Sequence, residues 1–300
     1  MLKKLMWITV VPVFLLLCLY MLMVYQNNRS IAYPQPEQLQ RKLEKSVLWL
    51  VEHEEQIVNE NNAMLWWMLY ETQKIAPDSR IADLLDKYMQ RYKSMLYGAW
   101  GPLFDKEKHS YLGGDSVRSM PYYNQHFIYA LNCAGKIAAE LPEIKRQNEA
   151  SFCHQLKYFY RPACTTHQLM GINFLFTGQC NELPEIDEVS RSLQQDIVLQ
   201  LTLDVRVVDV YLQRVLMLLI TGAEDSVKPI WMQQVLDHQL EDGSWGDFDP
   251  LLRLGDAGSL GFSSQILSIR QEQRGSFHAT AQGVYMLSYL LVGQNNTRVK

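Results

Sequence analysis

The first hydrophobic feature of the chain is an uninterrupted apolar stretch from residue 5 to residue 25, which contains no charged side chain. At about 1.5 Å per residue, a helix of this length spans the roughly 30 Å hydrocarbon layer of a bilayer. Lys3 and Lys4 precede the stretch, and positive residues favour the cytoplasmic side of a membrane helix. The pattern predicts a single-pass membrane protein with residues 1–4 in the cytoplasm, an anchor in the lipid bilayer, and a main domain that is periplasmic or extracellular.

The small residues Ser30 and Ala32 offer an alternative, because small residues at this spacing are typical of a signal-peptidase site. The apolar core of a cleaved signal peptide usually has about 7–15 residues, and the stretch here is longer. An uncleaved anchor is therefore the preferred interpretation. The two prolines of the following Tyr-Pro-Gln-Pro segment disfavour helix and predict a linker over residues 26–36, with a folded domain over residues 37–300.

Beyond the linker, apolar residues recur at steps of three and four, which is typical of helices, and alternating strand patterns are scarce. The predicted helices are strongly apolar ones at 62–76, 123–135, 166–178, 207–222 and 279–293, and more amphipathic ones at 79–93, 185–203 and 227–240. Each of the last four apolar helices closes with a glycine, and the spacings between these glycines along the chain are two nearly equal intervals and one longer interval. This recurrence predicts an all-α domain of helical-hairpin repeats, arranged as an open solenoid or as an α/α toroid.

Composition and charge narrow the classes of partner. The chain has 300 residues, 48% of them hydrophobic, and a formal net charge of -4. Acidic and basic residues are mixed along the sequence, so there is no basic stripe that could neutralise a phosphate backbone. We therefore expect no nucleic-acid partner. With no long Gly, Ser or Pro-rich linker inside residues 37–300, one folded domain is the simplest expectation.

One short segment gives a more specific indication of the fold. Residues Gln239 to Trp245 read Gln-Leu-Glu-Asp-Gly-Ser-Trp, and a small-residue helix containing Thr280 follows. Together these elements resemble the Gln-Trp motif of the terpenoid cyclases and protein prenyltransferases. The resemblance implies an α/α toroid in which Gln239 caps neighbouring backbone, Gly243 makes the turn and Trp245 packs over adjacent helices.

The catalytic motifs of those enzymes are not found in the sequence. There is no Asp-x-Asp-Asp run, and Asp247-Phe248-Asp249 is too short to replace it. The Asp, Cys and His ligands of the prenyltransferase zinc site cannot be assembled either. Asp242, Asp247 and Asp249 could chelate a hard cation, but they lack EF-hand spacing, which favours a solvated acidic turn. We therefore predict no metal and no cofactor.

Four cysteines lie close together in the middle of the domain. They are Cys133, Cys153, Cys164 and Cys180, and an even number in an exported domain permits two disulfides. Of the three pairings, Cys153 with Cys164 and Cys133 with Cys180 is preferred. A Cys₂His₂ zinc site using Cys153, His154, Cys164 and His167 is a less favoured alternative, because adjacent ligands at 153 and 154 are not the usual spacing.

Polar residues gather at the starts of the apolar helices. In a toroid these starts meet at one rim of the central cavity, so the residues become candidates for a shared site. The candidates for catalysis are His126, His167, His278 and Asp115, and the candidates for ligand binding are Tyr123, Asn124, Gln125, Gln168, Arg206, Asp209 and Gln282. Histidine is the side chain that most readily transfers protons near neutral pH. For any one residue, capping of free helix N–H groups is the simpler explanation.

These observations support a leading hypothesis about function and two alternatives. The leading hypothesis is an envelope-facing accessory protein that binds a lipid-linked, glycan or peptide ligand. The first alternative is a toroid enzyme, either a divergent isoprenoid transferase or cyclase or a glycan-processing enzyme. The second is a structural subunit of a membrane complex, which predicts a broad exposed apolar patch in place of a pocket.

Overall fold

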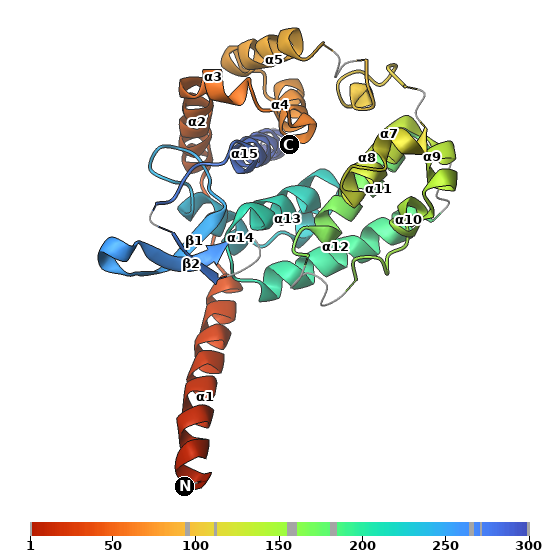
Figure 1. Ribbon diagram of the computed structural model, residues 1–300. Coiled ribbons are helices and arrows are strands. Elements are labelled where there is room, and N and C mark those ends of the chain that lie inside the picture. The colour runs from red at the N-terminus through yellow and green to blue at the C-terminus, as the bar shows by residue number, and fades with distance from the viewer. Residues whose placement is uncertain are drawn as a thin grey trace.

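The computed structural model describes residues 2–93, 97–110, 113–154, 161–180, 185–263, 267–270 and 272–298, and most of them are helical (Figure 1). The α-helices are α1 (Leu2–Asn27), α2 (Pro36–Glu52), α3 (Glu54–Ile57), α4 (Ala63–Ile75), α5 (Ser79–Arg91), α7 (Gly114–Val117), α8 (Tyr122–Asn132), α9 (Gly135–Glu140), α10 (Pro142–Arg146), α11 (Cys164–Thr177), α12 (Ile186–Leu203), α13 (Asp209–Ile220), α14 (Pro229–Asp237) and α15 (Phe277–Arg298). The 3₁₀ turns are η1 (Gly101–Leu103), η3 (Glu224–Ser226) and η4 (Gly255–Ala257). The strands are β1 (Phe248–Arg253), β2 (Ser259–Ser263) and β3 (Leu267–Arg270).

The core is built around the strongly apolar helices. α15 packs against α2, α4 and α13, while α11 packs against α8, α12 and α13. Nearly every side chain of α13 is buried, and in α15 residues 279–288 are all buried, because these segments face other elements on all sides. α5 buries only one face, where Ile81, Leu84, Leu85 and Tyr88 follow the helical period. The predicted helical character of the domain is thus confirmed.

Helix limits follow local capping chemistry more closely than the spacing of glycines. Asn62 caps α4 by accepting hydrogen bonds from the N–H groups of the first turn, and Asp78 caps α5 in the same way. Two of the predicted closing glycines do not end a helix. α8 ends before Cys133, which adopts a left-handed φ of 46°, so Gly135 begins α9. Gly293 lies inside α15, since glycine costs a helix only about 1 kcal/mol and does not by itself end one.

α1 is long and apolar enough, over Val10–Asn27, to cross a membrane, and it extends away from the rest of the chain (Figure 1). Its last residue, Asn27, is buried in the domain. The Asn27 amide donates to the Leu201 carbonyl at 2.6 Å, and its oxygen atoms accept from the Tyr211 hydroxyl at 2.9 Å and the Trp231 indole at 3.0 Å. The predicted linker therefore does not separate the anchor from the domain: the chain is already docked at residue 27.

The three-stranded sheet is a correction to the all-α prediction. β1, β2 and β3 form an antiparallel meander in that order. The strands are short, β1 contains Pro250, and the register shifts between Pro250 and Leu252. These irregularities break the alternation by which a strand is recognised in a sequence, which is why no strand was predicted here.

Candidate functional site

A cavity of about 570 Å³ opens among the N-terminal parts of α4, α8, α11, α13 and α15. Six of the residues chosen from the sequence line it: Tyr123, Asn124, His167, Asp209, His278 and Gln282. They come from four helices that are far apart in sequence. The starts of these helices therefore do meet at one place, and this cavity is the candidate site.

Asp209 and His278 form the charged part of the cavity wall. Nδ1 of His278 lies 3.1 Å from Oδ1 of Asp209, and the Gln282 amide nitrogen lies 3.2 Å from the same ring nitrogen. Burial opposes a charge on His278, but the Asp209 carboxylate outweighs it and raises the pKa of His278 above its ordinary value. Burial also opposes a charge on Asp209, and His278 outweighs it and lowers the pKa of that carboxyl. Both shifts favour the ion pair.

His167 is the second histidine of the cavity, and its environment favours the opposite protonation state. Its ring stacks on the Tyr123 ring with centroids 4.3 Å apart. Burial, helped by repulsion from His278, lowers the pKa of His167 to about 4. At neutral pH the cavity therefore contains a neutral imidazole beside the Asp209–His278 pair.

Replacing Asp209 with asparagine is expected to lower the pKa of His278, because burial then acts on the imidazolium without the attraction of the carboxylate. Histidine-selective NMR titration of the full chain measures this pKa directly. The contribution of a raised His278 pKa to stability is present below the ordinary histidine pKa of about 6.5 and is lost as pH rises through the raised value.

The exposed carboxyl of Asp115 supplies the matched control. Asp115→Asn should leave the His278 titration unchanged, since this residue is absent from the cavity lining. An unaltered His278 pKa in Asp209→Asn would show that the carboxylate does not control the protonation of the ring.

The rest of the lining is mostly apolar and includes four methionines: Met64, Met68, Met120 and Met170. Trp100, Phe127 and Leu216 add further apolar surface. Methionine side chains are flexible and polarizable, so such a wall adapts to ligands of irregular shape. These residues are not among the candidates that the sequence indicates, although Met64 and Met68 stand one helical turn apart at the start of an apolar helix, a pattern that could have identified them.

One buried polar atom in this wall has no partner. The Oε1 atom of Gln282 is buried and makes no hydrogen bond within the described part of the chain, although the side chain lines the cavity. Most buried polar side-chain atoms in proteins are hydrogen-bonded, and an unsatisfied acceptor costs about 1–3 kcal/mol. This oxygen atom is enclosed by protein, so the Gln282 side chain lines the cavity through its other atoms.

His126, which was also a candidate from the sequence, does not line this cavity. Its ring is completely buried between α8 and α11, where Nε2 lies 2.9 Å from the Asn148 side-chain oxygen and Gly171 packs against the ring. Burial lowers the pKa of His126 to about 4. Successive helical residues are rotated by about 100°, so Tyr123 and Asn124 line the cavity while His126 lies on another face of α8.

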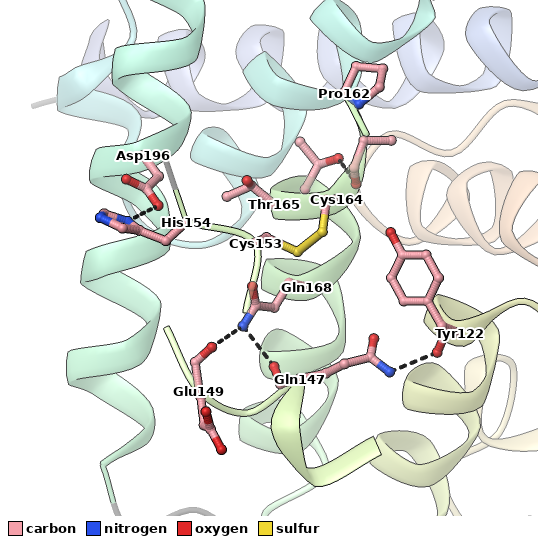
Figure 2. The surroundings of a disulfide bond; sticks show 12 residues. Tyr122, Gln147, Glu149, Cys153, His154, Pro162, Cys164, Thr165, Gln168 and Asp196 are labelled. Carbon is pink, nitrogen blue, oxygen red and sulfur yellow. Dashed lines mark hydrogen bonds and ion pairs between the residues drawn. A yellow bond between two sulfur atoms is a disulfide. The ribbon is translucent and has the colours of Figure 1, made fainter. Parts of the chain in front are cut away.

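The remaining candidates serve local structure. The Gln125 amide donates to the backbone of Arg118 and Met120. The Gln168 amide donates to the carbonyls of Gln147 and Glu149, as Figure 2 shows. None of Gln125, Gln168, Asp115 or Arg206 lines the cavity.

Arg206 and Asp115 are held in ion pairs instead. The Arg206 guanidinium lies 2.6 Å from the carboxylate of Asp204, which is also paired with the buried Arg214. The exposed Asp115 lies 3.4 Å from Arg118 on the same turn. Arg206 therefore has a structural partner, in agreement with the ion pair that a charged residue near an apolar helix requires.

A second cavity, of about 810 Å³, lies at the other ends of the same apolar helices. It is lined by Glu71, Lys74, Lys108 and aromatic residues including Phe104. Trp67 packs edge-on against Phe174 and Tyr285, with ring centroids 5.3 Å and 6.0 Å away. All three rings line the second cavity and none lines the first.

Two disulfides stabilise the side of the domain that carries α8 and α11. Cys133 is bonded to Cys180, and Cys153 is bonded to Cys164, which is the pairing preferred from the sequence. Figure 2 shows the second bond attaching the segment before it to the start of α11. Because both thiols are used in this bond, Cys153 and Cys164 are not zinc ligands. Within the described residues, no group of three or more His, Cys, Asp or Glu side chains could hold a metal ion.

The alternative ligands are likewise occupied. His154 lies 2.9 Å from the Asp196 carboxylate. In the acidic turn, Asp242 accepts hydrogen bonds from the N–H and the hydroxyl of Ser244. Asp247 forms an ion pair with Arg270. Asp249 accepts a hydrogen bond from the Val207 N–H and lies 3.3 Å from His238. The three aspartates therefore do not converge on one cation.

The Gln-Trp segment makes the contacts that the resemblance implies. The Gln239 amide donates to the carbonyls of Lys42 and Gly243 and to the Ser46 hydroxyl, at 2.8–2.9 Å. Gly243 adopts a left-handed φ of 98°, and a Cβ here would collide with the Lys45 backbone.

The tryptophan of the motif attaches α15 to α14. The indole of Trp245 donates to the Val235 carbonyl at 2.7 Å, its backbone N–H donates to the Thr280 hydroxyl at 3.1 Å, and its ring covers Gly283. The segment thus places the start of α15, with His278 and Gln282, against its neighbours.

Searches of protein-family models, curated proteins and solved structures gave no match to the chain. Membership of the terpenoid-cyclase superfamily stays a prediction.

Proposed function

We propose that this protein is a membrane-anchored helical-repeat protein whose 570 Å³ cavity binds an amphiphilic ligand, such as a lipid-linked glycan or peptide. The observation that carries the proposal is the division of the cavity wall into two parts. Methionines and aromatic residues form one part, while Asp209, His278 and the Gln282 side chain form the other. Binding sites commonly combine an apolar lining with a few polar groups that orient the ligand.

The proposed architecture is an α/α toroid whose inner helices are α4, α8, α11, α13 and α15. The contacts of α15 with α4 and α13, and of α11 with α8 and α13, support this arrangement. The hydrogen bonds of Gln239 and the packing of Trp245 support it further. A toroid places the starts of its inner helices at one rim, which accounts for a cavity built from residues of five helices.

The proposed anchor is retained in the mature protein. Cleavage after Ala32 would remove Asn27, and the Tyr211 hydroxyl and Trp231 indole would each lose a hydrogen-bond partner. We place the domain on the outer side of the membrane, because Lys3 and Lys4 favour a cytoplasmic N-terminus and disulfides persist in oxidising compartments. Intact-mass measurement of protein isolated from membranes should give the full chain, and a product beginning at Tyr33 would contradict retention.

The ligand can be sought by mass spectrometry of compounds that copurify with the full chain in nanodiscs. Met64→Trp fills the cavity from its wall, whereas Leu48→Trp adds the same ring at an exposed position on α2. We expect one amphiphile with wild type and with Leu48→Trp, reduced by about tenfold in Met64→Trp, which corresponds to about 1.4 kcal/mol of binding free energy. Equal recovery from all three proteins would place the ligand outside the cavity and refute the proposal.

The Asp209–His278 pair beside the neutral His167 favours one second candidate, an enzyme that transfers a proton within this cavity. The same mass spectrometry separates the two functions. An enzyme should carry product in the wild type and unconverted substrate in His278→Gln, so the bound compounds should differ in mass. A binding protein should carry the same compound in both.

A further inference from the structure

The three-stranded sheet is amphipathic. Residues that face each other across an antiparallel sheet share one side of it, and successive residues alternate sides. The register aligns Leu252 with Leu260 and Leu260 with Ile269, and it aligns Phe262 with Leu267. These five residues therefore form one apolar face, called here the sheet face, and the buried Asp249, which the register aligns with Phe262, lies on the same side at the base of the sheet.

The opposite side of the sheet is polar. Arg253, Ser259 and Arg270 are aligned on it, Ser268 and Gly261 are aligned with Pro250 in the next row, and the buried Phe248 lies on this side at the base. Such a sheet normally buries its apolar side against the rest of the protein. Here Leu252, Leu267 and Ile269 remain 57%, 51% and 60% exposed. The described residues of this chain therefore leave much of the sheet face uncovered.

The base of the sheet is linked to the site where α1 joins the domain. The Tyr20 hydroxyl of α1 donates to the Leu203 carbonyl at the end of α12, at 3.0 Å. Four residues later, the Val207 N–H donates to the carboxylate of Asp249 in β1, also at 3.0 Å. Four residues span at most about 14 Å, so the beginning of β1 lies close to α1. Figure 1 shows the sheet beside the domain end of α1.

The same contacts set the height of the domain above the bilayer. Tyr20 lies within the apolar stretch Val10–Asn27, about 10 Å along the helix from Asn27. Because Tyr20 already contacts Leu203, the end of α12 reaches the level of the last turns of the membrane helix. β1 is tied through Asp249 to Val207, four residues after Leu203, so the sheet is held near the membrane surface.

We propose that the sheet face inserts into the outer part of the bilayer that α1 spans, between headgroups and acyl chains. The proposal rests on α1 being a membrane anchor, as proposed above. Exposed leucine and isoleucine side chains bind this boundary by burying apolar area. The anchor and the sheet would then hold the domain at a fixed orientation on the membrane.

The test uses the full chain with Cys18→Ala, because Cys18 is free and the other four cysteines form disulfides. A single cysteine is introduced by Ile269→Cys and labelled with an environment-sensitive fluorophore. Phe176→Cys is the matched control, since Phe176 is equally exposed but lies on α11, and Val13→Cys reports on α1. The proteins are placed in vesicles of phosphatidylcholine and phosphatidylglycerol that contain nitroxide-labelled lipid.

We expect the label at residue 269 to be quenched at least about threefold more strongly than the label at residue 176, and the label at residue 13 to be quenched as well. Quenching at residue 13 without quenching at residue 269 would overturn the sheet proposal and leave the anchor intact. Loss of quenching at residue 13 would instead overturn the anchor itself. A label at residue 269 that is shielded in detergent, together with a dimeric size in solution, would show that a second copy covers the sheet face and would likewise overturn the proposal.

Discussion

Replacing Asp204 with asparagine is expected to lower the free energy of unfolding by about 3–5 kcal/mol, the largest effect that we predict for a single substitution. Asp204 is 6% exposed and lies between Arg206, at 2.6 Å, and the completely buried Arg214, at 2.8 Å. The substitution leaves both guanidinium groups without their carboxylate. Arg214 also donates to the Gln200 side-chain oxygen and to the Pro162 carbonyl, both at 3.2 Å, and neither of these acceptors carries the charge that Asp204 supplies.

The pH dependence of this effect follows from the pKa of Asp204. Burial opposes the carboxylate charge, but Arg206 and Arg214 together outweigh it and lower the pKa of Asp204 below the ordinary value. A lowered carboxyl pKa contributes stability above the ordinary aspartate pKa of about 3.9, and that stability is lost as pH falls through the folded-state value. The difference between wild type and variant should therefore be constant near neutral pH and shrink in acid.

Urea unfolding of the full chain in detergent, followed by circular dichroism, measures the difference. Asp247→Asn is the matched control, because Asp247 pairs with Arg270 in a half-exposed ion pair. Exposed ion pairs contribute about 0–1 kcal/mol, so this control should unfold nearly as the wild type does. Equal losses in the two variants would mean that burial does not determine the contribution of the Asp204 cluster.

The helices could be predicted because their signal is local. Apolar residues at steps of three and four, with Asn62 and Asp78 as caps, determine where α4 and α5 begin. The docking of Asn27 could not be predicted, since its partners lie more than 170 residues away in sequence. The sheet was missed for a different reason: its strands are short, irregular and partly exposed, so they do not produce the alternation of a half-buried strand.

The candidate site was predicted in part, and the division has a geometric cause. The expectation that helix starts meet at one cavity holds for Tyr123, His167, Asp209 and His278. It fails for His126, because the position of a helix start in space does not specify which way each side chain of that turn points. The rotation of α8 places Tyr123 at the cavity and His126 against Gly171. Only the packing of α8 on α11 sets that rotation.

Removing the Cys133–Cys180 disulfide is expected to lower the free energy of unfolding by about 4 kcal/mol, and removing Cys153–Cys164 by about 3 kcal/mol. The first bond closes a sequence separation of 47 residues and the second a separation of 11. Restricting a longer loop removes more entropy from the unfolded chain, so the order of the two effects is itself a prediction. Paired cysteine-to-alanine variants, unfolded in urea without reductant, give both values, and a reversed order would contradict the loop-entropy explanation.

The same cysteines test the side of the membrane on which the domain lies. Thiols stay reduced in most cytosolic compartments, whereas disulfides persist in the periplasm and outside the cell. Alkylation in intact cells, followed by mass measurement, should therefore leave the four domain cysteines unlabelled, because their thiols are bonded. Labelling of these four cysteines would place the domain in the cytoplasm and reverse the proposed topology. In the cytoplasm both disulfides would be reduced and would no longer stabilise the domain. A domain that is stable there would therefore need a core that does not depend on the bonds around α8 and α11.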